Sequence, residues 1–307
     1  MSESYPLVSF CMATRNRRDM LLTALESCCA QDVPSKEVLV FDDASSDGTR
    51  DAVEARFPDV RYFMQDRNRG IAYLRDQGLR EARGKYVFSV DDDAYYTGTD
   101  TVRQAVDYLE SHPGVAVAAM RYYEPFRQGP VSQELAAARN GDARLKTFVS
   151  CAYGIRRDLA LAAGGYRTFL FYRGEERDLS IRLLDGGYEI AYVDTPPVIH
   201  LYSPDRNWTA MTPYGIRNTL LFDYLNIPHP YVFPVLAVNC VQLYKYKLRL
   251  RECLPKLWYV VRGLGSCARY ARERKPVFLR TYKRFRSLPA HGAEPAPPGE
   301  RPPPATR

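Results

Sequence analysis

Residues 84–94 read GKYVFSVDDDA, a short apolar run that leads directly into three consecutive carboxylates. The β-branched and aromatic residues from Tyr86 to Val90, bounded by Gly84, predict a buried strand. Three like charges at the end of such a strand repel one another, and a protein core does not tolerate them without a counter-charge. The simplest counter-charge is a divalent cation that prefers oxygen ligands, Mg²⁺ or Mn²⁺. The alternative is a solvated acidic turn, and the triplet alone does not separate the two.

The composition is that of an ordinary globular protein, with 46% hydrophobic and 26% charged residues in a chain of 307. Such a chain is long enough for one large domain or two small ones. No apolar run reaches the roughly 18 residues of a membrane span, and residues 1–6 lack the regions of a signal peptide. Seven cysteines without Cys-x-x-Cys spacing disfavour a disulfide framework or a zinc cage. We therefore expect a cytoplasmic protein.

Strands and helices alternate along the first part of the chain. Apolar and β-branched runs predict strands at residues 7–12, 37–41, 60–64, 86–90 and 115–120. Apolar residues at helical spacing between these runs predict connecting helices. The alternation is typical of an α/β protein with a parallel sheet and right-handed connections.

Polar clusters follow three of these strands at the point where each strand ends. They are residues 14–16, residues 42–43 and the acidic triplet. Because ligands bind at the carboxyl ends of parallel strands, these clusters are expected to converge on one crevice. One acidic turn has no special meaning, but three polar strand ends in one place predict a metal site that holds a phosphorylated ligand.

The second half of the chain is less regular. Residues 122–142 are expected to form a loop, and residues 147–155 and 188–193 to form strands. After Gly174, a helix begins with acidic residues in its first turn, where the helix dipole favours them. Its Asp178 is expected to pair with Arg182, four residues later.

The C-terminal third is basic and helical. In residues 226–286, Lys and Arg alternate with leucines and aromatic residues, the composition of a helix that lies on an anionic membrane. A nucleic-acid surface and an ordinary helical packing domain are the alternatives. Residues 287–307 are rich in Pro, Ala and charge and are expected to be disordered. The remaining residues, 1–225, are expected to form the main domain.

Six segments together resemble the inverting family-2 glycosyltransferases, which have a GT-A fold. These segments occur in that family's order and spacing, and they are residues 8–17, 41–49, 68–70, 90–93, 164–166 and 174–179. The resemblance covers residues 5–225. Residues 200–204 and 214–218 also look like the rhamnosyltransferase-like enzymes of bacterial surface glycans. The implied fold is a mostly parallel central sheet flanked by helices.

The resemblance implies that a sugar is transferred, with inversion, from a UDP-, dTDP- or GDP-linked donor to an acceptor hydroxyl. The implied acceptor is a glycan or a lipid-linked saccharide of bacterial surface glycan or glycolipid synthesis. Such an acceptor fits a peripheral protein on the inner face of the plasma membrane, and nucleic acid is not an expected partner. The implied cofactor is a divalent cation, Mg²⁺ or Mn²⁺, that neutralises the diphosphate leaving group.

The resemblance also assigns roles to residues after the first three strands. Thr14 and Asp43 match positions that contact the base and ribose of the nucleotide. Arg15 and Arg17 are placed to meet phosphate or sugar oxygens, with a solvated surface turn as the alternative. Arg69 is assigned to the substrate as well.

The acidic triplet matches the DXD pair of the family. Asp91 is expected to face the ribose or the metal and Asp93 to bind the metal, with Asp92 as an extra residue between them on the substrate side. In many related enzymes a histidine at the position of His200 completes the metal site. The alternative for His200 is a surface or packing role.

Glu176 matches the family's catalytic base, which is usually Asp in a Glu-Asp pair. Here the pair is Glu175-Glu176, so Glu175 is the competing assignment. Two adjacent carboxylates can raise one pKa, which suits a general base. The alternative is that acidic residues simply favour the start of a helix.

Two other functions remain open. A sugar-phosphate nucleotidyltransferase would share the fold class and the metal, but it normally has a glycine-rich loop after the first strand, and residues 12–18 contain no glycine. A non-catalytic carbohydrate or nucleic-acid binding protein would not need Asp91, Asp93 and Glu176 together.

Overall fold

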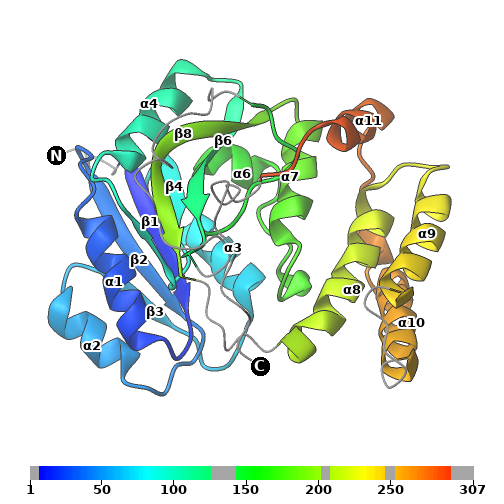
Figure 1. Ribbon diagram of the computed structural model, residues 1–307, viewed down its shortest axis with the longest axis horizontal. Helices are drawn as coiled ribbons and strands as arrows, with labels where there is room; N and C mark the ends of the chain where they lie inside the picture. Colours follow the sequence, from blue (N-terminus) through cyan, green and yellow to red (C-terminus); the bar gives the residue numbers. More distant parts are fainter. Residues whose placement is uncertain (1–6, 126–142, 202–207, 246–252, 292–307) are drawn as a thin grey trace, which may run out of the picture.

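The computed structural model describes residues 7–125, 143–201, 208–245 and 253–291. At the centre of this part of the chain is an eight-stranded sheet with the order β3-β2-β1-β4-β7-β6-β8-β5 (Figure 1). The strands are β1 Val8–Thr14, β2 Lys36–Asp42, β3 Arg61–Met64, β4 Tyr86–Ser89, β5 Ala94–Tyr96, β6 Val115–Tyr123, β7 Tyr153–Arg156 and β8 Glu189–His200.

The half of the sheet that contains β1 is parallel. β1 pairs with β2 and β4, and β2 pairs with β3, all in the parallel sense. The other half is mixed, because β7 runs antiparallel to β4 and β6, while β8 is parallel to β6 and antiparallel to β5. The predicted α/β fold class is confirmed, and the carboxyl ends of β1, β2 and β4 lie along one edge.

Some elements differ from the sequence-based expectation. Residues 147–155 contribute only to the short β7, and β8 continues to His200 through Pro196 and Pro197. These prolines lie at a bulge in the β6–β8 pairing, where a missing N–H breaks no regular ladder. The loop expected at 122–142 begins later because β6 extends into it, and residues 126–142 lie outside the described residues.

Helices cover both faces of the sheet. One face is covered by α1 (Arg18–Cys29), α2 (Thr49–Arg56) and α4 (Thr101–Ser111), and the other by α3 (Ile71–Glu81), α6 (Arg157–Ala162) and α7 (Glu175–Asp185). Each helix buries an apolar stripe, as Leu21 and Leu25 of α1 illustrate. Within α7 the predicted pair of Asp178 and Arg182 is confirmed at 2.9 Å.

Further helices lie at one end of the molecule (Figure 1). They are α8 (Trp208–Asn226), α9 (Val232–Lys245), α10 (Cys253–Arg269) and α11 (Leu279–Ser287). Leu220 and Leu225 of α8 share a hydrophobic core with Val260 and Cys267 of α10. The domain boundary expected after residue 225 would therefore divide α8 from α9 and α10, although α8 packs against both.

The chain beyond α11 is ordered further than expected. Residues 288–291 dock on the sheet domain, since the Pro289 carbonyl accepts the Lys146 N–H at 2.8 Å and His291 is buried. The rest of the expected tail, residues 292–307, lies outside the described residues. Among the described helices, none combines the length and the apolar content that crossing a bilayer requires.

Candidate active site

The last two carboxylates of the triplet are buried beside Arg17. Asp92 accepts hydrogen bonds from Thr14 Oγ1 at 2.9 Å and from Arg17 at 2.8 Å, and Asp93 accepts one from Arg17 at 3.0 Å. Burial raises the pKa of Asp92 to about 6, although the Arg17 guanidinium opposes this rise. The triplet is thus not a solvated turn, and Arg17, which was expected to meet phosphate, here neutralises part of its charge.

Arg75 of α3 links the triplet to the acidic start of α7. Its guanidinium donates to Asp91 at 2.9 Å, to Glu175 at 2.5 Å and to Glu176 at 3.2 Å. The Arg75 and Glu175 side chains are 7% and 3% exposed, whereas that of Glu176 is 19% exposed. Burial, and then the charge of Glu176, raise the pKa of Glu175 to about 8 against the effect of Arg75. Glu175 is therefore the buried partner of Arg75, and Glu176 is the more accessible carboxylate.

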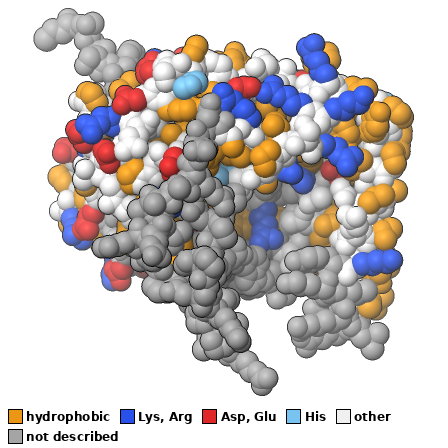
Figure 2. Space-filling view, turned by 45° about the horizontal axis from the view of Figure 1, so that its top comes forward, with side chains coloured by type: hydrophobic (Ala, Val, Ile, Leu, Met, Phe, Trp, Pro, Cys, Tyr) orange, Lys and Arg blue, Asp and Glu red, His pale blue; other side chains and the backbone are white. Residues whose placement is uncertain are grey.

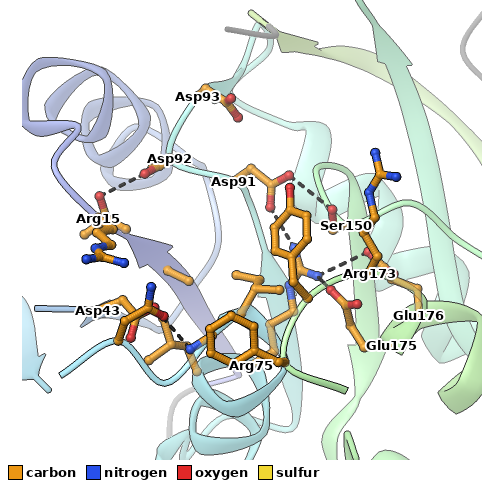
Figure 3. A pocket seen from close by; sticks show the side chains of 18 of the residues that line it. Arg15, Asp43, Arg75, Asp91, Asp92, Asp93, Ser150, Arg173, Glu175 and Glu176 are labelled. Carbon is orange, nitrogen blue, oxygen red and sulfur yellow. Dashed lines mark hydrogen bonds and ion pairs between the residues drawn. The ribbon is translucent and has the colours of Figure 1, made fainter. Parts of the chain in front are cut away.

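These side chains surround a cavity of about 540 Å³, a size typical of small-molecule sites. Figure 3 shows Arg15 and Asp43 on one side of it and Glu175 and Glu176 on the other, with Asp91 between them. The residues predicted from the sequence that line the cavity are Thr14, Arg15, Arg17, Asp43, Asp91, Asp92, Asp93, Glu175 and Glu176. The structure therefore brings the strand ends and the start of α7 together.

The Asp43 carboxylate holds the segment that precedes α3. It accepts the backbone N–H of Arg69 at 2.6 Å and that of Gly70 at 3.2 Å. A Cβ at Gly70 would lie 2.5 Å from the Phe171 ring, so only glycine fits there. The Arg69 guanidinium lies over the Tyr73 ring, 4.5 Å from its centroid. Arg69 therefore contacts the site residue Asp43 with its backbone N–H and not with its side chain.

His200, at the end of β8, lies beside the triplet. Its Nε2 is 3.2 Å from Asp93 and its Nδ1 is 2.9 Å from Glu124. Burial disfavours the charged ring, but the hydrogen bonds with Asp93 and Glu124 outweigh burial and raise the pKa of His200 to about 9. One ligand atom from each of Asp91, Asp93 and His200 lies within 4.8 Å of the others. Two carboxylates and one imidazole fit a divalent cation that keeps positions open for a diphosphate.

Arg75, Glu124 and Ser150 belong to the site but were not predicted. Arg75 follows Leu74 on the apolar side of α3, and a charge in that position is itself a signal of a buried ion pair. Glu124 directly follows the buried β6, which is the pattern that singled out the triplet after β4. Ser150 donates to Asp91 at 3.1 Å, and its sequence surroundings carry no comparable signal.

Comparison with known proteins gives a family and several relatives. The pattern described as Glycosyl transferase family 2 matches residues 9–169, just over half of the chain. The succinoglycan biosynthesis protein ExoO of Rhizobium meliloti (strain 1021) is 40% identical over 103 residues, 33% of this chain and 28% of ExoO. The UDP-Glc:alpha-D-GlcNAc-diphosphoundecaprenol beta-1,3-glucosyltransferase WfaP of Escherichia coli is 30% identical over 107 residues, 34% of this chain and 42% of WfaP. The matches thus span less than half of either relative.

Solved structures share the fold over most of the chain. S. aureus TarS 1-349 in complex with UDP-GlcNAc has a TM-score of 0.64 at 18% identity, covering 85% of this chain and 80% of that one. The mannosyltransferase PcManGT from Pyrobaculum calidifontis, in complex with GDP-Man and Mn²⁺, has a TM-score of 0.58 at 20% identity, covering 93% and 80%. The fold is therefore the GT-A fold expected from the sequence.

Proposed function

The chain belongs to glycosyl transferase family 2, and we propose that it transfers a sugar from a nucleotide-diphosphate donor to an acceptor hydroxyl, with inversion at the sugar carbon. The observation that carries this proposal is one cavity lined by the acidic triplet and by Glu176. An in-line displacement needs a stabilised leaving group on one side of the sugar carbon and a base on the other. Such a reaction requires no covalent nucleophile.

Glu176 is the general base in this proposal. Its carboxylate lines the cavity, is more exposed than that of Glu175, and receives a hydrogen bond from Arg75 that orients it. It takes the proton of the acceptor hydroxyl as that oxygen attacks the sugar carbon. Glu175 has the role of holding Arg75, because its burial favours the neutral carboxyl and limits its contact with an acceptor.

Asp91, Asp93 and His200 would hold a divalent cation, Mg²⁺ or Mn²⁺. When bound, this cation neutralises charge on the departing nucleotide diphosphate. Arg17 keeps Asp92 and Asp93 in place from the other side of the triplet. The nucleotide contacts are assigned to Thr14, Arg15 and Asp43, which line the same cavity.

The proposed donor is a UDP-, dTDP- or GDP-linked sugar, and the structural neighbours in complex with UDP-GlcNAc and GDP-Man support this class. The proposed acceptor is a glycan or lipid-linked saccharide of a bacterial surface polymer. The names of ExoO, for succinoglycan biosynthesis, and WfaP, for a diphosphoundecaprenol-linked acceptor, support this choice. A lipid-linked acceptor would place the enzyme at the inner face of the plasma membrane.

Donor turnover by a matched pair of variants tests the proposal. Release of nucleoside diphosphate from UDP-, dTDP- and GDP-sugars is measured with Mn²⁺ present. Glu176→Gln should lower kcat by about 10²- to 10⁴-fold, the usual contribution of a general base, with donor affinity in calorimetry little changed. Glu175→Gln should cost less, because it alters the partner of Arg75 and leaves the proton acceptor intact.

The other outcomes are equally informative. If Glu175→Gln is the inactive variant and Glu176→Gln turns over, the base assignment is off by one residue. Formation of nucleoside triphosphate and sugar 1-phosphate when pyrophosphate is added to the nucleotide sugar would indicate nucleotidyl transfer. Nucleotide binding with no turnover of any donor would leave a binding protein and refute sugar transfer.

A further inference from the structure

Helix α10 exposes a row of large apolar side chains. The exposed fractions are 79% for Leu254, 50% for Leu257, 57% for Trp258, 51% for Val261 and 43% for Leu264. These residues recur at spacings of three and four, so they lie on one face of the helix. Single exposed leucines are common on protein surfaces, but a continuous row of this kind marks an interaction site.

The opposite face of α10 is already packed within the chain. Val260 and Cys267 lie in the core shared with α8. A Cβ on Gly263 would lie 2.7 Å from Cδ1 of Leu220, so the two helices are in close contact there. The exposed row is therefore not needed to hold α10 in place.

Helix α9 packs beside α10 and adds the exposed side chains of Phe233, Val238 and Val241. We call these residues and the α10 row the α9/α10 surface. Figure 1 shows both helices at the outer end of the molecule, with α8 between them and the sheet. Figure 2 shows hydrophobic side chains along this end, with Lys and Arg side chains beside them.

The charge around the α9/α10 surface is positive. Over their own lengths, Val232–Lys245 and Cys253–Arg269, helices α9 and α10 contain four basic residues, Lys245, Lys256, Arg262 and Arg269, and no acidic residue. Arg262 and Arg269 are exposed along one border of the α10 row, and the Arg262 guanidinium lies over the Trp258 ring. A second copy of the chain would bring like charges together, whereas anionic lipid headgroups would complement them.

We propose that the α9/α10 surface docks on an anionic lipid bilayer, with the α10 row at the boundary of headgroups and acyl chains. Arg262 and Arg269 then lie at the level of the lipid phosphates. Helices with an apolar face and a cationic border lie in the plane of the membrane and do not cross it. Docking rests on the proposed function only for its purpose, access to a lipid-linked acceptor, and requires no sugar transfer.

Vesicle flotation of the full chain tests the docking. The chain should float with vesicles of phosphatidylglycerol and phosphatidylcholine, and much less with phosphatidylcholine alone. The double variant Leu254→Ser/Trp258→Ser should lower the partition coefficient at least about tenfold, because two large apolar side chains leave the contact. Arg262→Gln/Arg269→Gln should weaken binding to the anionic vesicles and reduce its salt dependence.

Tryptophan emission reports the contact directly, since the chain has only Trp208 and Trp258. The emission should shift to the blue on binding, and Trp258→Phe should remove the shift. Met64→Ser is the matched control, because Met64 is 46% exposed on β3, a strand at the edge of the sheet, and its loss should leave flotation unchanged. Circular dichroism and nucleotide binding establish that each variant is folded.

The docking would be refuted if the wild-type chain did not bind anionic vesicles, or if the double variant floated like the wild type. It would also be refuted if mutations of the α9/α10 surface changed only self-association or salt-sensitive RNA binding. Wild-type flotation without transfer from any donor would leave the docking intact and refute the proposed function alone.

Discussion

Glu124 and His200 form a buried pair beside the acidic triplet. The Glu124 carboxylate contacts Nδ1 of His200 at 2.9 Å, and Nε2 lies 3.2 Å from Asp93. Metal-binding histidines almost always use the second ring nitrogen for such a contact, which fixes the tautomer and the ring orientation. Glu124 is therefore expected to be a positioning residue for the cation site.

Glu124→Gln should lower the affinity for Mn²⁺ by about tenfold or more, because the amide keeps the size of the side chain but removes the charge that makes imidazole a better ligand. Electron paramagnetic resonance of free Mn²⁺, titrated in the presence of UDP, measures this without turnover. Glu110→Gln is the control, since Glu110 forms an exposed ion pair with Lys85. Equal affinities in both variants and the wild type would mean that Glu124 only packs against His200.

The sequence predicted the parts of the site that lie at strand ends. The triplet and Asp43 each follow an apolar run, so their place at one sheet edge could be inferred from local patterns. The pairing of Arg75 with Glu175 joins residues that are 100 positions apart, and no local pattern specifies it. The same holds for Ser150 and Asp91.

Among the elements, β7 depends on one glycine. β7 lies between β4 and β6, and Gly154 is paired opposite Phe88 of β4. A Cβ at Gly154 would lie 2.5 Å from the Phe88 ring, which is fully buried and has no room to move. The close packing of these strands therefore requires the absence of a side chain.

Gly154→Ala should lower the free energy of unfolding by about 1–3 kcal/mol, the usual cost of overpacking a core. Gly114→Ala is the matched control, because a Cβ there meets no atom within 4 Å, and it should change stability by less than about 0.5 kcal/mol. Urea unfolding followed by circular dichroism measures both. If the two variants unfold at the same midpoint, the Phe88 ring can yield and the packing argument fails.

The elements that were predicted from the sequence are those specified by local patterns, and the ones that were missed depend on pairing with distant residues. In the first half, the helices and the strands β1 to β4 and β6 have clear local periodicity, so their types and order were predicted, whereas the three-residue β5 was not. The antiparallel direction of β7 depends on partners far along the chain, as does the length of β8, whose end pairs with β5. The two prolines of β8 locally favour a turn. The strand continues because it pairs with β6 on both sides of the bulge.

At the scale of the whole molecule, the C-terminal segment returns to the sheet domain. The His291 N–H donates to the Thr147 carbonyl at 3.3 Å, and the Val149 N–H donates to Nδ1 of His291 at 3.2 Å. The His291 ring also packs edge-on against Tyr122 and Tyr192. These contacts fix residues 147–149, which lead directly to Ser150 in the candidate site.

The docked His291 makes the stability of the protein depend on pH. Burial lowers the pKa of His291 from 6.5 to about 4 in the folded chain, although a backbone contact with Met120 opposes this. The unfolded chain therefore binds a proton first as the pH falls. The contribution of the neutral ring is complete above pH 6.5 and is lost between pH 6.5 and 4, by up to about 3 kcal/mol.

His291→Gln should remove this pH dependence, because Gln still offers an acceptor to the Val149 N–H but takes up no proton. The melting temperatures of wild type and variant should run parallel above pH 6.5, and the wild type should then fall more steeply towards pH 4. Calorimetric scans across this range measure the two slopes, and other titrating groups cancel in the difference. Parallel curves down to pH 4 would show that the proton affinity of His291 does not change on folding, and that the docked segment does not exclude water from the ring.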